Sequence, residues 1–384
     1  MSASLDSVLI IYVDDDNTSG PWDGSSEHPY ETIQDGIDHA VTGDWVFVHT
    51  GIYQENIIID TSIRLLGEEK TTTIIDGGKL DDVVSIRCDD VVLSGFTVCN
   101  SSHDLEQGLW WKAGIRIIGS DVTIIDTIIR DNLQGIFLKQ AEHLTLLNNQ
   151  FINDGLTIYP YDTGYTIRPT VKRSYYLHQI DNNTVNGKPL LYHIDEENIE
   201  ISSPLGQLIL VNCTSCKIHN ISIENTDFPI LFFNCHHCII EHVNCSQNEG
   251  ICSFLYSNDN YIKHSQFNQN MHGFLLDYCS SENRFYQNTF SNNLFCGLIC
   301  EYRSNDNVIF ENNFIDNLGF DAFVIKAFST TWKENYWSDW IGVDHQFLRW
   351  LPKLIFGTHF ESHQRIKTYI NVDVSPSLEQ YDIV

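Results

Sequence analysis

Apolar and polar positions repeat at a regular interval along much of this chain. Five consecutive units of 21 to 24 residues each hold two short apolar segments, an Asn-rich corner and often a glycine; they are 207–229, 230–250, 251–273, 274–297 and 298–320. Residues 115–135 and 136–155 follow the same template. Repeats of this length, rich in β-branched residues and without helical periodicity, are typical of a parallel β-helix whose coils stack about 4.8 Å apart. We therefore predict an all-β solenoid.

The pattern changes at three places. Residues 31–40 place apolar side chains at helical spacing and predict a capping helix at the N-terminal end. Residues 159–206 interrupt the repeat with an aromatic and polar insertion, and residues 332–384 are no longer repeat-like. The predicted organisation is a β-helix over 1–331 that contains the insertion, followed by a C-terminal tail, 332–384, that packs on the solenoid.

Stacked coils place equivalent residues in ladders along the solenoid. Asn260, Asn283 and Asn307 fall at the same corner of successive units. A second register runs through Asn225, Asn248, Asn270 and Asn293. Asparagine side chains bond readily to backbone groups in turns, so these residues are expected to hold corners together rather than to act chemically.

Two Cys-x-x-Cys pairs one unit apart raise the question of a metal site. Four thiolates at Cys213, Cys216, Cys235 and Cys238 are a donor set for Zn²⁺ or Cu(I), with His236 and His237 nearby. A disulfide between stacked rungs would also use these cysteines if its geometry fits, and the main alternative is that small buried thiols replace Asn or Ser in a ladder. Alignment of the units supports the alternative: Cys216 and Cys238 fall at the corner of Asn260, and Cys213 and Cys235 align with Tyr256, Cys279 and Arg303. We favour the structural ladder because adjacent rungs arrange four sulfurs in a rectangle.

The first strand of each unit should point positions two and four outward. Position four reads Lys139, Tyr159, Phe233, Phe254, Asp277 and Glu301. Asp277 and Glu301 would stack at about 5 Å, which suits a catalytic carboxylate pair or a Ca²⁺ site, although two solvated carboxylates on an acidic protein are the explanation we favour. Position two is largely apolar: Arg116, Phe137, Thr157, Ile209, Leu231, Cys252, Leu275 and Ile299. Such a face needs a cover, from the tail, the insertion or a second subunit in a homo-oligomer.

Two loops carry the residue types that contact sugars. Residues 101–114 include adjacent tryptophans, and 159–178 are rich in tyrosine. Aromatic faces pack against apolar sugar faces, and nearby charged groups bond hydroxyls. The predicted carbohydrate-binding residues are Trp110, Trp111, Lys112, Arg116, Lys139, Tyr159, Tyr161, Asp162 and Arg168. Aromatic residues that merely cover strand ends are the structural alternative.

Composition narrows the partners. The formal net charge is −29, from 22 Lys and Arg against 51 Asp and Glu, which disfavours nucleic acid. No run of 18 apolar residues predicts a membrane span, and no signal peptide is visible at the N-terminus. No cofactor is required by the pattern; Ca²⁺ is the first candidate, before Cu or Zn.

Segments at both ends and in the middle resemble one family. Residues 12–68, residues 182–215 and the motifs "NYWSDW" (335–340) and "RWLPKLIFG" (349–357) are similar to the entry, re-entry and ending of NosD-type proteins, especially archaeal ones. The resemblance implies a right-handed, pectate-lyase-like parallel β-helix. It also implies an extracytoplasmic or cell-surface location, and links by name to copper delivery and by fold to carbohydrate-binding and sugar-hydrolase domains.

These observations together predict a carbohydrate-binding β-helix surface protein, with polysaccharide processing as a glycoside hydrolase or lyase left open. The two alternatives are a NosD-type accessory protein that binds copper or another metal, and a purely structural surface module.

Overall fold

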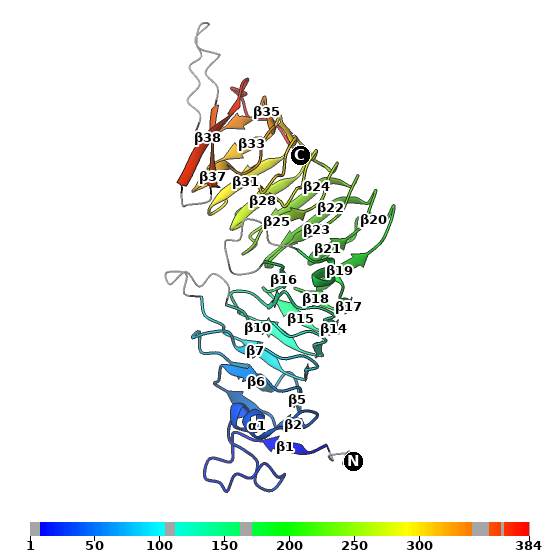
Figure 1. The fold of residues 1–384 in the computed structure, drawn as a ribbon, viewed down its shortest axis with the longest axis vertical. Helices are drawn as coiled ribbons and strands as arrows, with labels where there is room; N and C mark the ends of the chain where they lie inside the picture. Colours follow the sequence, from blue (N-terminus) through cyan, green and yellow to red (C-terminus); the bar gives the residue numbers. More distant parts are fainter. Residues whose placement is uncertain (1–7, 104–111, 162–170, 340–352, 362–364, 384) are drawn as a thin grey trace. The chain divides into compact units, whose positions relative to one another are not determined.

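The chain folds into two compact units, Met1–Leu190 and Leu191–Val384, which are described separately (Figure 1). The computed structural model describes residues 8–103, 112–161, 171–339, 353–361 and 365–383, with the backbone alone for 356–361 and 365–369. Both units are built from stacked parallel strands, so the chain is a right-handed parallel β-helix of about 12 turns. No helix in these ranges is long and apolar enough to cross a membrane.

The described part of unit 1 holds three parallel sheets. The first sheet contains β1 (Ile10–Val13), β2 (Trp45–Val48), β5 (Arg64–Gly67), β8 (Val92–Ser94), β11 (Thr123–Ile125), β14 (Thr145–Leu147) and β17 (Gln179–Asp181). The second contains β3 (Gly51–Tyr53), β6 (Thr73–Asp76), β9 (Thr97–Cys99), β12 (Ile128–Arg130), β15 (Gln150–Ile152) and β18 (Thr184–Val185). The third contains β4 (Ile57–Ile59), β7 (Val84–Ile86), β10 (Ile115–Ile117), β13 (Ile136–Lys139) and β16 (Leu156–Tyr159). A 3₁₀ turn, η1 (Arg173–Tyr176), precedes β17.

The predicted capping helix is present as α1 (Ile33–His39), and it begins where its sequence provides a cap. The Thr32 side chain accepts a hydrogen bond from the backbone N–H of Asp35, satisfying one donor of the first turn. Ile33, Gly36 and Ile37 face the core. A Cβ at Gly36 would lie 2.6 Å from Val13 Cγ2, so glycine is needed for the helix to approach β1 this closely.

Unit 2 stacks its strands in three columns, and β19 (Lys188–Ile194), paired antiparallel with β18, leads into it. The first column contains β21 (Gln207–Val211), β23 (Ile230–Phe233), β25 (Cys252–Leu255), β28 (His272–Asp277), β31 (Cys296–Glu301), β34 (Phe320–Ile325) and β37 (Lys353–Glu361). The second contains β20 (Glu200–Ile201), β22 (Lys217–Glu224), β24 (Ile239–Ser246), β26 (Tyr261–Lys263), β29 (Arg284–Tyr286), β32 (Val308–Phe310), β35 (Thr331–Lys333) and β38 (Arg365–Asp373). The third continues from β24 through β27 (Gln266–Asn268), β30 (Thr289–Ser291), β33 (Asn313–Ile315) and β36 (Tyr336–Trp337).

Asparagine ladders join the coils of unit 2 as predicted. The Oδ1 atom of Asn283 accepts from the backbone N–H of Asn260 at 3.0 Å and from its Nδ2 at 3.1 Å, and Asn307 serves Asn283 in the same way. All three residues are buried. Each Asn therefore donates toward the next coil, so the ladder has a direction.

Several ladders end on an aspartate. Asn317 Nδ2 donates to Asp321 at 2.8 Å, and the backbone N–H and Nδ2 of Asn335 both donate to Asp373 Oδ2. In unit 1, Asn132 Nδ2 donates to Asp154 at 2.8 Å. A carboxylate accepts hydrogen bonds without needing to donate, which suits the last position of a directed ladder.

The register differs from the sequence prediction by one residue at one corner. Leu231 pairs with Ser253 and Phe233 with Leu255, so Ser253 and Leu255, and not Cys252 and Phe254, occupy outward positions two and four. Likewise, Cys235 stacks on Ser257, Ser280 and Ser304 in turn, and not on Tyr256, Cys279 and Arg303. For Cys279 and Arg303 the physical reason is an extra corner residue in these later coils, whereas the shift at Ser253 and Ser257 comes from a unit taken as 21 residues long where the register repeats after 22. Cys279 (φ 60°) and Arg303 (φ 67°) lie in the left-handed region, next to a second such residue, and absorb it.

Strands of the solenoid also occur in the predicted insertion, 159–206, and after residue 331, where the sequence no longer shows the repeat. Strands β17 and β18, inside the predicted insertion 159–206, pair with β14 and β15. Beyond residue 331, β35 and β36 continue the second and third columns, and β37 pairs with β34 while forming an antiparallel hairpin with β38. The described part of the segment 332–384 thus contributes strands to the solenoid.

Candidate functional site

The outer face of the third sheet of unit 1 brings together most of the described residues predicted to bind carbohydrate. Arg116 lies on β10 between Ser85 and Phe137 of the neighbouring strands. Further along β13, on the same face as Phe137, Lys139 pairs in register with Tyr159 of β16. Strand stacking alone therefore places side chains from four coils in a row on this face.

Arg116 is fixed by a carboxylate that was not among the predicted site residues. Its Nε donates to Asp82 Oδ2 at 2.6 Å and its Nη2 donates to Asp82 Oδ1 at 2.9 Å, a bidentate pair that also fixes the guanidinium plane. Lys112 pairs with Asp81 and lies 3.8 Å from Asp82. Burial raises the pKa of Asp81, but the hydrogen bond from Lys112, the backbone N–H of Asp82 and the charges of Lys112 and Arg116 together outweigh burial and lower the pKa.

An aromatic row continues from the guanidinium. The Arg116 Cζ lies 4.7 Å from the centroid of the Phe137 ring, and Phe137 stacks on Tyr159 with centroids 5.4 Å apart. Tyr161 meets Tyr159 at 4.8 Å with the ring planes at 90°. Both tyrosines are of intermediate exposure, whereas Phe137 is buried. We call Asp82, Arg116, Phe137, Tyr159 and Tyr161 the unit 1 row.

Four other predicted binding residues, Trp110, Trp111, Asp162 and Arg168, lie outside the residues that the structure describes. The position of Asp82 could have been found from the sequence. Aligning the apolar strands of 82–86 and 113–117 places Asp82 one coil before Arg116. The sequence pattern predicts that Phe137 points outward, but it does not indicate that this residue connects Arg116 to Tyr159.

The predicted carboxylate pair lies in consecutive coils of unit 2. Asp277 follows Leu276, which pairs with Cys300, the residue before Glu301, so the two acids are neighbours across the coils. Asp277 is 3% exposed rather than solvated as expected. Glu301 is of intermediate exposure as a whole residue, but its carboxyl is enclosed. Burial, and then the charge of Asp277, raises the pKa of Glu301 to about 8, although Lys326 opposes the shift.

The four predicted metal-ligating cysteines line the core of unit 2. Cys213, Cys216, Cys235 and Cys238 are buried among apolar side chains, and their thiols are unoxidised. Cys235 Sγ donates to Leu210 O at 3.3 Å, and Cys238 Sγ donates to His236 O at 3.4 Å. Burial raises the pKa of Cys235 well above its usual range, whereas hydrogen bonds with Cys216 and Cys235 lower the pKa of Cys213. Within the described residues no three His, Cys, Asp or Glu side chains are grouped to hold an ion.

The apolar outer stripe of unit 2 is largely covered within the chain. Ile209 and Leu231 are fully buried, and Ile299 is nearly so. Ile299 packs with Ile251 and Cys296, and half-buried Leu275 and Phe323 lie against them.

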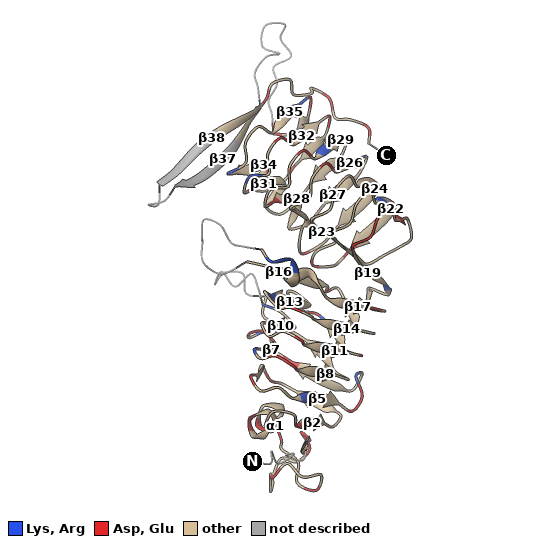
Figure 2. Cartoon of the chain, turned by 45° about the vertical axis from the view of Figure 1, so that its right-hand side comes forward, with Lys and Arg blue, Asp and Glu red and all other residues tan. Residues whose placement is uncertain are grey.

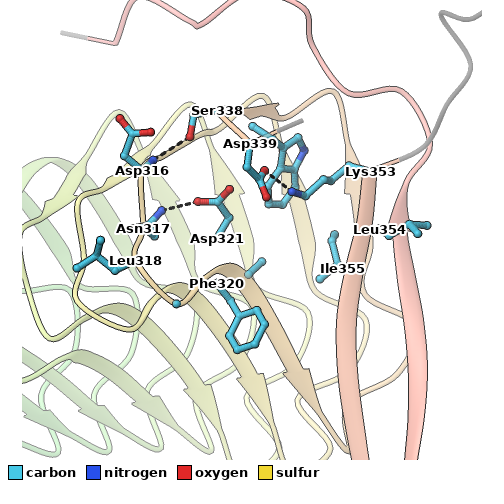
Figure 3. A pocket seen from close by; sticks show the side chains of 13 residues that line it. Asp316, Asn317, Leu318, Phe320, Asp321, Ser338, Asp339, Lys353, Leu354 and Ile355 are labelled. Carbon is cyan, nitrogen blue, oxygen red and sulfur yellow. Dashed lines mark hydrogen bonds and ion pairs between the residues drawn. The ribbon is translucent and has the colours of Figure 1, made fainter. Parts of the chain in front are cut away.

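A pocket of about 450 Å³ lies in unit 2 between the corner that precedes β34 and the start of β37 (Figure 3). It is lined by Asp316, Asn317, Leu318, Gly319, Phe320, Asp321, Ala322, Trp337, Ser338, Asp339, Lys353, Leu354 and Ile355. Nothing in the repeat pattern indicates it, because Lys353 comes from a strand outside the units that the sequence shows.

Comparison with known proteins agrees with the sequence resemblance. No curated protein matches the chain significantly. Among solved structures, the chain is similar to a GH136 lacto-N-biosidase from Eubacterium ramulus, at 11% identity and a TM-score of 0.34, over 84% of this chain and 67% of that one. It is also similar to the A-module of mannuronan C-5 epimerase AlgE6 from Azotobacter vinelandii, at 13% identity and a TM-score of 0.32, over 85% and 93%.

A third similar structure is pectate lyase Pel9A, at 13% identity and a TM-score of 0.28, over 87% of this chain and 81% of that one. The fold assignment rests on the strand pairing of this chain itself and not on these distant likenesses. The family model described as "Periplasmic copper-binding protein (NosD)" matches residues 161–342. The resemblance to the NosD family is thereby confirmed over residues 161–342, which are similar to that family.

Proposed function

We propose that the protein binds carbohydrate through the unit 1 row. The observation that carries the proposal is the contact series from the Asp82–Arg116 ion pair, across Phe137, to Tyr159 and Tyr161. It unites, on one face, a rigid charged pair with aromatic rings. Sugar hydroxyls are recognised by such planar charged groups, and the C–H faces of sugar rings pack on aromatic side chains.

The arrangement of the tyrosines supports sugar contact at the Tyr161 end of the row. Phe137 and Tyr159 stack with their planes 29° apart, so one face of Tyr159 is used inside the row. Tyr161 is perpendicular to Tyr159 and is partly exposed. A ring turned in this way adds a partly exposed apolar surface beside Tyr159, which pairs in register with Lys139.

A glycan array followed by calorimetry tests the proposal. The wild-type protein should bind at least one class of oligosaccharide, and Tyr161→Ala should weaken binding about tenfold, as expected for the loss of one aromatic contact worth about 1.4 kcal/mol. Tyr161→Phe keeps the ring and should retain most of the affinity. The control is Tyr286→Ala on the outer face of unit 2. A wild-type protein that binds no glycan, or a Tyr161→Ala variant that binds normally, contradicts the proposal.

Polysaccharide processing is the finer proposal, and it would depend on Asp277 and Glu301. A carboxyl whose pKa is raised to about 8 keeps its proton at neutral pH and can serve as a general acid. Asp277, at 3% exposure, has little access to a polymer, so the pair would have to act through Glu301. Release of reducing ends or unsaturated products that disappears in Glu301→Gln would support processing; release that persists in this variant would refute the role of Glu301.

Metal binding is the second candidate, and the description of the matching family favours it. The same description supports an extracytoplasmic location. The four core sulfurs each lie close to a backbone carbonyl, and we assign no metal-dependent step to Cys213, Cys216, Cys235 or Cys238. Elemental analysis for Cu, Zn and Ca of protein purified without chelators tests this candidate. Near-stoichiometric metal that is lost in a Cys216→Ser/Cys238→Ser variant would establish a site there, whereas metal retained in that variant would place it elsewhere.

A further inference from the structure

The pocket of unit 2 combines a cavity with an uneven set of charges. Its volume of about 450 Å³ lies in the range of small-molecule sites. Three carboxylates, Asp316, Asp321 and Asp339, and a single ammonium, Lys353, are the charged groups that line it. With all four ionised, the lining carries two excess negative charges, in a chain whose formal net charge is −29. Figure 2 shows basic residues as short, separate stretches among the acidic ones. This electrostatic environment attracts cations.

One carboxylate is placed inside the pocket by the fold itself. Asp321 is 8% exposed, and its Oδ1 accepts from Asn317 Nδ2 at 2.8 Å, at the end of an asparagine ladder (Figure 3). Burial, and the neighbouring carboxyl of Asp339, raise the pKa of Asp321 to about 6. Two carboxyls this close disfavour simultaneous ionisation, and a cation between them would relieve the repulsion.

Lys353 shows how an ammonium is accommodated there. Its Nζ pairs with Asp339 and lies 5.4 Å from the centroid of a Trp337 ring. A carboxylate combined with the face of an indole is a favourable environment for an alkylammonium ion. Lys353 neutralises one of the three carboxylates, which leaves Asp316 and Asp321 for a second cation.

The remaining walls favour a cation with an organic body. Leu318, Phe320 and Leu354 line the pocket and are exposed at 75%, 48% and 46%. Apolar side chains of this kind contact carbon atoms of a ligand and give nothing to a bare ion. Since no three acidic, Cys or His side chains of the described ranges are grouped to hold a metal ion, the carboxylates suit a dispersed organic cation better.

We propose that this pocket binds small organic ammonium compounds, with the ammonium group at the buried carboxylate of Asp321 and the carbon body against Leu318 and Phe320. The site lies wholly in unit 2 and is independent of the unit 1 row. An amino sugar is one member of this ligand class, and a linear diamine is another. The two share only the primary ammonium group.

Calorimetric or NMR titration with cadaverine, glucosamine and N-acetylglucosamine tests the proposal in the full-length protein. Cadaverine and glucosamine should bind, and glucosamine should bind at least about tenfold more tightly than N-acetylglucosamine, because acetylation removes the charge that pairs with the carboxylates. Equal affinity for the charged and the acetylated sugar, or no detectable binding of either amine, would overturn the proposal.

Variants locate the site. Asp316→Asn/Asp339→Asn removes two charges without touching the ladder that ends on Asp321, and should weaken cadaverine binding about tenfold or more. Asp306→Asn is a matched control, since Asp306 is exposed and, like Asp316, has a left-handed backbone. Loss of binding in the control, or full binding in the double variant, would contradict the assignment. Tyr161→Ala should leave cadaverine binding unchanged, which separates a failure here from a failure of the glycan proposal.

Discussion

Replacing Glu301 with glutamine should stabilise the protein at alkaline pH and leave it almost unchanged at acidic pH. The folded protein holds the pKa of this carboxyl at about 8, against an ordinary value of 4.5. Between these two values the folded chain keeps a proton that the unfolded chain releases, so the free energy of unfolding falls as the pH rises through this window. The variant carries a neutral amide of the same shape and escapes that loss.

The size of the effect on the free energy of unfolding follows from the change in the pKa of Glu301. At 1.36 kcal/mol per pKa unit, a change from 4.5 to about 8 corresponds to at most about 5 kcal/mol above pH 8. Asp277 and Lys326 share the titration, so a gain of about 2–3 kcal/mol for Glu301→Gln at pH 9 is the realistic expectation. At pH 4.5 the difference between variant and wild type should be within about 1 kcal/mol.

Urea unfolding followed by tryptophan fluorescence, at several pH values between about 4.5 and 9, measures the difference directly. Glu241→Gln is the contrasting control. Hydrogen bonds from Lys263 and then Lys217, each 2.9 Å from the carboxylate of Glu241, lower the pKa of Glu241 to about 2. The ionised carboxylate therefore stabilises the folded protein, and this contribution is fully present at pH values above the ordinary pKa of 4.5. This control should be destabilised by a constant amount across the range. If the Glu301→Gln and wild-type curves run parallel in pH, the argument that burial and Asp277 keep Glu301 protonated is refuted.

Other predictions concern the solenoid. Asn283→Ala should cost about 3 kcal/mol in urea unfolding, since it leaves the backbone N–H of Asn260 and the carbonyl of Ser257 without their partners; a loss below about 1 kcal/mol would contradict the ladder. Cys238→Asn should be neutral or stabilising in the same assay, because it extends this ladder by one rung, and strong destabilisation would show that the thiol has another role. Gly95→Ala should cost about 3 kcal/mol, since the added Cβ would lie 2.4 Å from Gly67 O at φ +82°, and a normal melting temperature would refute it. Thiol titration in denaturant should find eleven free cysteines, and fewer would reveal disulfides.

The sequence predicted the β-helix, its capping helix and its ladders because a solenoid repeats its local rules in every coil. Each coil must bury the same inward positions and close the same corners, so the period is visible in the residues themselves. The error of one residue at Ser253 and Ser257 arose from a unit taken as 21 residues long, whereas the register repeats after 22 residues at this place. Left-handed corner residues such as Cys279 and Arg303 absorb an extra residue without changing the apolar pattern, so an alignment by hydrophobicity cannot detect them.

The candidate sites were predicted less completely, because they depend on contacts between segments distant in the chain. Arg116 and Tyr159 were identified by residue type, but their link through Phe137 depends on the stacking register. The burial of Asp277 could not be read from its outward position, because outward residues of a β-helix are exposed only where nothing covers them. The pocket beside Lys353 forms because β37 pairs with β34, and the sequence repeat does not predict this pairing.

The asparagine ladders have one consequence for assembly. Each rung donates its backbone N–H and one side-chain amide hydrogen toward the next coil, while the second amide hydrogen bonds a carbonyl of the preceding coil. Asp321 and Asp373 receive the last of the forward donors without offering any in return. A second solenoid stacked end to end on these carboxylates would find no donor for the Oδ1 atom of its own first rung, and two acceptor oxygens would face each other. The aspartates therefore end the asparagine ladders: they accept the last hydrogen bonds within one molecule and disfavour end-to-end stacking of solenoids into a fibre.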